Sequence, residues 1–238
     1  MAAGLGMRLA PLTDRWPKPV LPIDGRPVVV TLVHELAAAG IERVVVVTGH
    51  LAEQVEALLE PLPYELRFVR QPEALGSADA VARAEASPPF LVAGADTRFA
   101  DGDVGRFVAA AHGSEGAIAV RLQPGRPDYT RTHVEDGRIV QVIAPTAPGG
   151  WSGAPLWWLG AQVASFLQPL PGRPPHELGE VMQLAIDAGV VVSAIPVGRT
   201  RDLTSPDSGR TGPNCRRNPR VTGSKCQQFG AARGARWA

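Results

Sequence analysis

The opening of the chain holds two glycines and two cations at a spacing suited to binding phosphate. Gly4 and Gly6 allow tight turns and leave no Cβ between the backbone and an anion. Backbone N–H groups in such a loop can cradle an anion. Arg8 and Lys18 add two positive charges, and the prolines on either side of Lys18 stiffen the loop. A Gly-x-Gly pair alone predicts only a turn, but the combination predicts a phosphate-binding loop.

Strands and helices alternate after this loop. Apolar residues at helical spacing predict helices, at 27–40, 51–59, 77–86, 104–112 and 177–188. Short β-branched or alternating runs predict strands, at 43–48, 64–69, 89–93, 117–121 and 190–196. An Asp-Gly turn predicts an antiparallel hairpin at 133–142. Segments rich in Gly and Pro are interpreted as loops, at 123–128, 145–155 and 169–175. The pattern predicts an α/β fold with a mixed, mostly parallel sheet and helices on both faces.

Composition excludes several classes of protein. The 238 residues are 45% hydrophobic and 20% charged, which is typical of a globular protein and excludes disorder throughout. No apolar run approaches the roughly 18–20 residues of a membrane span, and the start lacks the pattern of a secretory signal. Cys215 and Cys226 form neither a disulfide framework nor a zinc cluster. We therefore expect a cytoplasmic enzyme without a membrane partner.

Several motifs resemble those of the sugar-1-phosphate nucleotidyltransferases. Residues 2–9 (AAGLGMRL) and 17–19 (PKP) are similar to that family's L-A-A-G-x-G-x-R-L…P-K-P opening. Further likenesses occur at 71–78 (QPEALGSA), at Ala95-Asp96 after a predicted buried strand, and at 201–207 (RDLTSPD). The motifs follow the family's order over residues 1–207. The resemblance implies a Rossmann-like, nucleotide-diphospho-sugar transferase fold for this region.

The resemblance also implies a reaction and its participants. A sugar 1-phosphate attacks the α-phosphate of a nucleoside triphosphate, giving a nucleotide sugar and pyrophosphate, with Mg²⁺ as cofactor. Ala3, Gly4 and Gly6 would bind the nucleotide. Arg8 would neutralise the leaving pyrophosphate, and Lys18 would lie near the α-phosphate or the sugar phosphate. Such chemistry depends on positioning and on charge neutralisation.

Four more residues take roles from the resemblance, and three of them have simpler interpretations. Asp96 and Asp202 would hold Mg²⁺ through oxygen atoms, although Asp96 could instead cap a helix and Asp202 could belong to a turn. Gln71 would read a base edge, but it could also be an exposed loop residue. Gly76 would permit close approach of the base or ribose.

Two departures from the family affect the core of the domain. A hydrophobic strand precedes the corresponding Leu in the family, and here Met1 takes the place of that Leu. We therefore expect the sheet of residues 1–207 to lack a central strand. Ala144 stands where the family often has a lysine that contacts the sugar phosphate, and Arg131 or Arg138 could substitute for that lysine.

A third departure is the end of the chain. Residues 208–238 hold seven basic residues and no acidic one, whereas residues 1–207 hold 17 basic and 23 acidic residues. This basic tail has no hydrophobic period and is predicted to be disordered. A nucleic-acid-binding tail is the weaker alternative, because only Phe229 and Trp237 supply aromatic rings.

Two other functions remain open at this point. A nucleotidyltransferase for a non-sugar phosphate acceptor would account for Ala144. A non-catalytic nucleotide binder would keep the glycine loop without needing the metal, although it leaves Asp96 and Asp202 without a role. The sequence identifies neither the base nor the acceptor, and it leaves the oligomeric state open.

Overall fold

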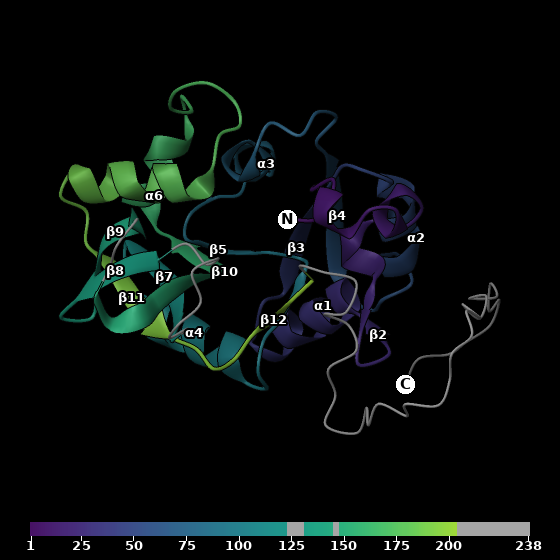
Figure 1. Ribbon diagram of the computed structural model, residues 1–238, viewed down its shortest axis with the longest axis horizontal. Helices are drawn as coiled ribbons and strands as arrows, with labels where there is room; N and C mark the ends of the chain where they lie inside the picture. Colours follow the sequence, from purple (N-terminus) through teal and green to yellow (C-terminus); the bar gives the residue numbers. More distant parts are fainter. Residues whose placement is uncertain (123–130, 145–147, 204–238) are drawn as a thin grey trace.

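Helices cover both faces of a sheet in the computed structural model, which describes residues 1–122, 131–144 and 148–203 (Figure 1). The main sheet has six strands, in the order β5 (Phe90–Ala93), β10 (Trp151–Leu159), β7 (Gly116–Leu122), β11 (Val192–Pro196), β9 (Arg138–Ala144) and β8 (Arg131–Glu135). Three two-stranded sheets accompany it: β3 (Arg43–Thr48) with β4 (Glu65–Arg70), β1 (Pro22–Ile23) with β2 (Arg26–Pro27), and β6 (Thr97–Arg98) with β12 (Arg201–Asp202).

The side chains of β7 show how the two faces are built. Ala117 and Ala119 pack into one buried cluster, and Ile118 and Val120, which alternate with them, pack into another. The first cluster includes side chains of α1 (Val28–Ala38), α2 (Ala52–Leu59) and α4 (Asp103–Ala111). The second includes α3 (Ser77–Arg83), α5 (Ala161–Ala164) and α6 (Leu178–Asp187). Because strand residues alternate between faces, an apolar run on β7 needs a helical layer on each side.

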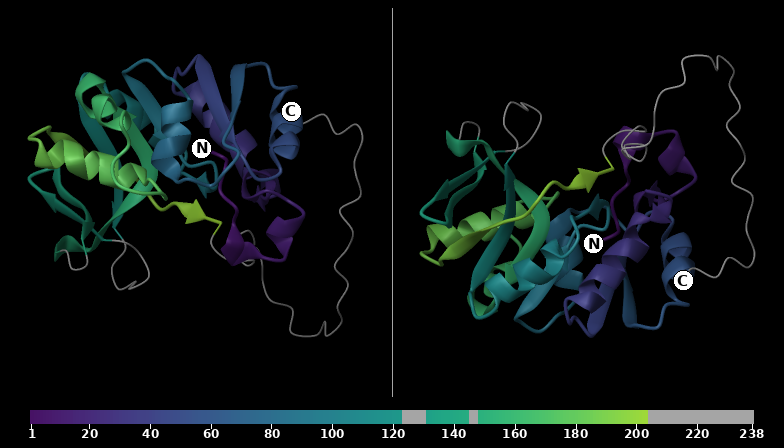
Figure 2. Two further views of the ribbon diagram at one scale, coloured as in Figure 1. Left: turned by 90° about the horizontal axis from the view of Figure 1, so that it is seen from above. Right: turned by 90° about the horizontal axis from the view of Figure 1, so that it is seen from below.

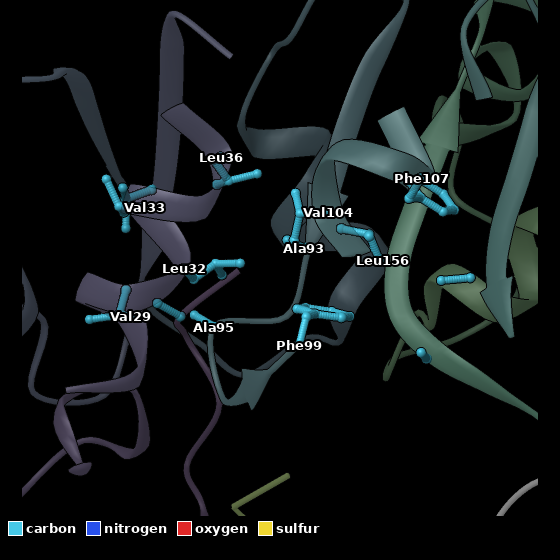
Figure 3. Close-up of a cluster of buried hydrophobic side chains, with 14 of the residues drawn as sticks. Val29, Leu32, Val33, Leu36, Ala93, Ala95, Phe99, Val104, Phe107 and Leu156 are labelled. Carbon is cyan, nitrogen blue, oxygen red and sulfur yellow. The ribbon is translucent and has the colours of Figure 1, made fainter. Parts of the chain in front are cut away.

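Large side chains from several elements meet in the first cluster. Figure 3 shows Val29, Leu32 and Leu36 of α1 with Phe107 of α4 and Leu156 of β10. Phe107 and Leu156 are fully buried. This packing fixes α1, which begins at Val28 shortly after the glycine-rich opening of the chain, against the first cluster.

The α/β class and the two helical layers are confirmed, but the expectation of a mostly parallel sheet is wrong. Among the described strands, only β3 with β4 and β7 with β11 pair in parallel. The main reason is β10, which lies antiparallel between β5 and β7. The Gly- and Pro-rich composition of 145–155, which includes Gly153 and Pro155, predicts a loop, but β10 begins at Trp151; residues 145–147 lie outside the described residues. The structure accommodates both residues in a register shift between Gly153 and Trp157.

The structure describes the chain up to residue 203. Residues 204–238, including the basic tail predicted at 208–238, lie outside the described residues. The last described strand, β12, crosses from the β11 side back to the opening of the chain (Figure 2). Among the described residues, no helix has both the length and the apolar character needed to cross a membrane.

Candidate active site

The glycine loop, residues 3–20, consists of three short 3-10 helices, Met7–Leu9, Leu12–Asp14 and Lys18–Val20. Gly6 has φ +67°, and a Cβ at this position would lie 2.8 Å from Thr13 Cγ2, so a larger residue would be strained there. Around Gly4, by contrast, a Cβ would meet no atom within 4 Å. The loop therefore needs Gly6 for its own conformation, whereas Gly4 leaves open space beside the backbone.

Side chains from the turn after β3 and from α2 hold the loop in place. His50 Nε2 lies 2.7 Å from the Thr13 carbonyl oxygen, and Gln54 Nε2 donates to the Arg15 carbonyl oxygen at 3.0 Å. Thr13 Oγ1 donates to the Gly6 carbonyl oxygen at 3.0 Å. These bonds use loop carbonyl groups. The later N–H groups of the loop, from Leu9 to Val20, largely bond carbonyl oxygens of the loop itself, whereas those of Gly4, Leu5 and Gly6 bond no group in the described part of the chain and remain as donors for an anion.

Two of the predicted loop residues differ sharply in exposure. Ala3 is buried against Gly49, where an added Cβ would lie 2.8 Å from the Ala3 carbonyl oxygen. Arg8 is exposed, and its guanidinium makes no hydrogen bond or ion pair with any residue in the described part of the chain. Arg8 thus contributes little to the packed core and remains available for an anion.

The cation at the far end of the loop contacts a carboxylate at the end of β5. Lys18 Nζ forms an ion pair with Asp96 Oδ2, and their side chains are 22% and 33% exposed. Asp96 lies beyond the carboxyl end of β5, where α/β sheets bind ligands. The structure therefore brings together Lys18 and Asp96, which are 78 residues apart in the sequence.

Asp202 reaches the same region through the pairing of β12 with β6. Its strand register places it opposite Thr97, whose Oγ1 donates to Asp202 Oδ1 at 2.8 Å. The same hydroxyl lies 3.5 Å from Asp96 Oδ1. Arg121 Nη1, at the end of β7, lies 2.8 Å from Asp202 Oδ2, and both side chains are largely buried. One hydroxyl thus links the two carboxylates, and each carboxylate has a cationic partner.

The simpler interpretations of these residues are wrong. Asp96 caps no helix, because β6 begins at the next residue. Asp202 lies in a strand and is held by Thr97 and Arg121, so it is not a turn residue. Gln71 is only 5% exposed, so it is not an exposed loop residue.

Gln71 is fixed by the residues that follow it. Its backbone N–H donates to the Thr48 carbonyl oxygen at 2.7 Å, which places it beside the end of β3. Its amide Nε2 donates to the Gly76 carbonyl oxygen at 3.0 Å and to Asp79 Oδ2 at 2.7 Å. Burial raises the pKa of Asp79, but hydrogen bonds from Arg83 and Gln71 outweigh it and hold the pKa below its usual value.

The backbone of His176 lies close against Gly76. The φ of Gly76 is +101°, and a Cβ there would lie 2.3 Å from the His176 carbonyl oxygen. His176 also bonds the chain on both sides of Gly76, with its N–H to the Leu75 carbonyl oxygen and its carbonyl oxygen to the Ala78 N–H, each at 2.8 Å. The glycine is therefore required by this backbone contact, and its contact with a base or ribose stays a prediction.

Sequence reasoning missed the residues that link the site together. Thr97, Arg121 and His50 were not predicted to take part in it. One signal was present for Arg121, since it ends the apolar run of β7 and a buried arginine needs a charged partner. Thr97 and His50 carried no such signal, because their roles depend on which strands and loops lie next to them.

The donor set of Asp96 and Asp202 fits Mg²⁺ by its chemistry. Carboxylate oxygens are hard ligands, and Mg²⁺ is commonly held by one or two carboxylates together with substrate phosphates. The described residues contain no cluster of three or more His, Cys, Asp or Glu side chains suited to a metal. The two carboxylates linked by Thr97 match the smaller set that a metal bound with nucleotide needs.

Comparison with known proteins places the chain in a family. Residues 1–188 match the family described as the MobA-like NTP transferase domain. The chain belongs to this family. A 2-aminoethylphosphonate cytidylyltransferase of Lancefieldella rimae is 49% identical over 63 residues, which are 26% of this chain and 26% of that protein. A mannose-1-phosphate guanyltransferase beta-B of Xenopus laevis is 29% identical over 156 residues, 60% of this chain and 43% of that protein.

A solved structure shows the same fold over most of the chain. It is an inositol-1-phosphate CTP transferase from T. maritima, with a TM-score of 0.74, 23% identity, and coverage of 87% of this chain and 88% of that one. The two sequence matches span less than half of the length of each relative. The relatives are nucleotidyltransferases that differ in base and in acceptor, so the family and the fold are established while the substrates are not.

Proposed function

We propose that the protein transfers a nucleotidyl group from a nucleoside triphosphate to a sugar 1-phosphate, with Mg²⁺ as cofactor. The observation that carries this proposal is the contact between Lys18 of the glycine loop and Asp96 at the end of β5, extended to Asp202 through Thr97. It sets the glycine loop, a lysine and two carboxylates side by side. Nucleotidyl transfer needs this combination of positioned anion donors and hard metal ligands.

The reaction assigns a role to each charge. An oxygen of the acceptor phosphate forms a bond to the α-phosphorus, and the bond from the α-phosphorus to the bridging oxygen of the leaving pyrophosphate breaks. Lys18 would orient the α-phosphate or the acceptor phosphate, and exposed Arg8 would balance the charge that develops on pyrophosphate. Mg²⁺, held by Asp96 and Asp202, would neutralise phosphate charge. Lys18 would leave its ion pair with Asp96 when that carboxylate holds the metal, so that the Lys18 charge could act on phosphate.

The hydrogen bonds of the Gln71 amide indicate which nucleotide base the site would prefer. Both N–H groups of its amide are engaged by the Gly76 carbonyl oxygen and Asp79, and both partners accept hydrogen bonds, which fixes the orientation of the amide. Its Oε1 is therefore the atom left to read a base, and it can only accept. Cytosine presents an amino group to such an acceptor, whereas uracil and thymine present a carbonyl oxygen. We infer a preference for CTP over UTP, in keeping with the cytidylyltransferase relative.

The hairpin of β8 and β9 offers a cation for the acceptor. Ala144 is 3% exposed and has no charge, but Arg131 lies directly opposite it in the strand register. Cross-strand partners have Cβ atoms about 4.5–5.5 Å apart. Arg138 pairs with Glu135 at the far end of the same hairpin. Arg131 is thus the better placed of the two arginines to replace the family's lysine.

A phosphonate is the second candidate acceptor. The absence of a lysine at Ala144 and the similarity to a 2-aminoethylphosphonate cytidylyltransferase favour it. Its phosphonate oxygen would attack the α-phosphorus in the same way as a sugar phosphate. The two acceptors therefore share the site of Lys18 and Asp96 and differ only in the group beyond the attacking oxygen.

A substrate screen separates these candidates. Each of the four ribonucleoside triphosphates is combined with glucose 1-phosphate, mannose 1-phosphate or 2-aminoethylphosphonate, and pyrophosphate release is measured with Mg²⁺ present. We expect turnover with CTP and one acceptor class, and a nucleotide conjugate of matching mass. Pyrophosphate release with no acceptor present would indicate hydrolysis, and nucleotide binding without any release would favour the non-catalytic binder.

The role of Arg131 is tested with Arg138, at the other end of the same hairpin, as control. Arg131→Ala should raise the KM for the acceptor by about tenfold or more, corresponding to about 1.4 kcal/mol or more of binding energy. Arg138→Ala removes an equal charge from the same hairpin and should leave that KM unchanged. Equal effects of the two variants would show that Arg131 acts only through the net charge of the hairpin.

A further inference from the structure

The side-chain amide of Gln71 is held by two acceptors from different parts of the chain. Its Nε2 donates to Asp79 Oδ2 at 2.7 Å and to the Gly76 carbonyl oxygen at 3.0 Å. Gln71 Oε1 bonds no residue in the described part of the chain, and it is not sealed in the interior. The oxygen of the amide therefore reaches the surface of the protein, while its nitrogen is bonded to the protein.

Rotating this amide by half a turn about its last bond would exchange its oxygen and its nitrogen. Oε1 would then lie against Asp79 Oδ2 and the Gly76 carbonyl oxygen, and each contact would bring two acceptors together. The rotated amide would present N–H groups to a base, and these suit the carbonyl oxygen of uracil but not the amino group of cytosine. The two acceptors thus decide which base the amide can read.

The surroundings of Asp79 keep its side chain an acceptor. Asp79 is buried in the first turn of α3, and Arg83, one turn later, donates from Nε to the same Oδ2 at 2.7 Å. Burial raises the pKa of Asp79, but the hydrogen bonds from Arg83 and Gln71 outweigh it and hold the pKa below its usual value. An ionised carboxylate can only accept, so Asp79 has no donor to offer to a rotated amide.

The second acceptor is a main-chain group in a loop that His176 holds in place. The His176 carbonyl oxygen accepts from the Ala78 N–H, and the His176 N–H donates to the Leu75 carbonyl oxygen, each at 2.8 Å. A carbonyl oxygen of the backbone is present whatever side chains the loop carries. Of the two acceptors, only Asp79 belongs to a side chain, so the sequence acts on the orientation of the amide through this residue.

We propose that Asp79 is a positioning residue that sets the discrimination between cytosine and uracil by fixing the orientation of the Gln71 amide. The proposal rests on the proposed function, in which Gln71 Oε1 reads the base. Asp79 contacts the nitrogen of that amide and acts on the base only through it. A chain with the same glutamine but no acceptor at position 79 should therefore bind cytidine and uridine nucleotides with more similar affinities.

Two substitutions of Asp79 separate its role as an acceptor from its charge. Asp79→Asn keeps the size and one acceptor oxygen, and the donors of Gln71 and Arg83 select that oxygen. Asp79→Leu has a similar size and no acceptor. Calorimetric titration of the full chain with CTP and with UTP, each with Mg²⁺, gives the ratio of the two Kd values. We expect CTP to be favoured about tenfold or more by the wild type and by Asp79→Asn, and about twofold or less by Asp79→Leu.

Val81→Ala is the control for destabilisation of the helix. Val81 is a buried apolar residue of α3, so its truncation lowers Tm without removing an acceptor from Gln71. This variant should keep the ratio of the wild type. An unchanged ratio in Asp79→Leu, an equal loss of the ratio in Val81→Ala, or a wild type that binds CTP and UTP alike would overturn the proposal.

The titrations contain no acceptor substrate, so they report on base recognition and not on transfer. Loss of the ratio in Asp79→Leu alone would support the role of Asp79 even if the substrate screen released no pyrophosphate, a result that would overturn only the proposed reaction. Pyrophosphate release with the same base preference in the wild type and in Asp79→Leu would overturn the role of Asp79 and support the reaction. Binding of neither nucleotide would overturn both.

Discussion

Gly4 and Gly76 lack a side chain for different reasons: Gly4 leaves open space beside the loop, and Gly76 lies against the backbone of His176. A Cβ at Gly4 would meet no atom within 4 Å, whereas one at Gly76 would lie 2.3 Å from the backbone of His176. We therefore expect Gly4→Ala to keep its Tm within about 1 °C and to raise the KM for the nucleotide about tenfold, because the added methyl group occupies ligand space. Thermal melts and steady-state kinetics measure the two effects.

Gly76→Ala is the matched substitution with the opposite expectation. Strain at φ +101° together with the clash should cost about 1–3 kcal/mol or more of folding stability. A destabilised Gly4→Ala with unchanged KM would contradict the assignment of Gly4 to the nucleotide site.

Arg8 should contribute to catalysis and not to folding, since it is exposed and its guanidinium makes no hydrogen bond or ion pair with another described residue. Arg8→Ala is expected to lower kcat by about a hundredfold or more while Tm stays unchanged, because it removes charge that stabilises the leaving group. Arg15→Ala, an exposed arginine of the same loop, is the control and should keep most of the activity. A loss of Tm in Arg8→Ala with normal kcat would place Arg8 in the structure of the loop instead.

Two hairpins of the fold turn at an Asp-Gly pair, and the Asp of one of these turns forms an ion pair. The other turn can therefore serve as a control. Asp24-Gly25 joins β1 to β2, and Asp136-Gly137 joins β8 to β9, both with positive φ. Arg201 Nη1 donates to Asp24 Oδ1 at 2.6 Å, and this bond lowers the pKa of Asp24. The bond links the β1–β2 turn to β12, which carries Asp202.

Asp24→Asn should therefore destabilise the protein at pH 7 by a few tenths to about 1 kcal/mol, since the pair is partly exposed. A carboxylate with a lowered pKa stabilises the fold above its ordinary pKa and loses that effect as the pH falls. The difference between Asp24→Asn and the wild type should thus shrink as the pH falls below about 4, the ordinary pKa of Asp, and vanish once the pH is below the lowered pKa. Asp136→Asn changes the same turn without an ion pair in the described chain and should show no such pH dependence.

The elements that sequence patterns predict well are those with a clear local period. The helix at α2 and the strand at β3 follow their patterns almost residue for residue, because each has one continuous apolar face or run. The strand β10 escaped prediction because Gly153 and Pro155 argue locally against it, and only pairing with β5 and β7 stabilises it. The same limit applies to the site: the motifs predict Lys18 and Asp96, but the link through Thr97 depends on β6 pairing with β12.

At the scale of the whole molecule, the end of the described chain supports its beginning. Leu203 is 3% exposed and packs in a cluster with Leu9, Leu21, Ile23 and Val28. Its backbone N–H also donates to the Asp96 carbonyl oxygen at 3.1 Å. The segment after β12 therefore buttresses both the glycine loop and the strand end that carries Asp96.

Leu203→Ala should lower the free energy of unfolding by about 2–5 kcal/mol through the cavity it leaves. It should also reduce affinity for the nucleotide, because the glycine loop loses its support. Leu184→Ala, at a position 39% exposed on α6, is the control and should have little effect on either quantity. Chemical denaturation and nucleotide titration of both variants check this expectation.

The most direct test of the account is nucleotide conjugate formation by Asp96→Asn. The substitution keeps the size of the side chain and removes the charge that contacts Lys18 and that would hold Mg²⁺. We predict that conjugate and pyrophosphate formation fall by about a hundredfold or more with Tm nearly unchanged, and that added Mg²⁺ restores only part of the rate. Asp101→Asn, a nearby and highly exposed carboxylate, should behave like the wild type. Normal conjugate formation by Asp96→Asn at ordinary Mg²⁺ concentration would contradict the proposed active site.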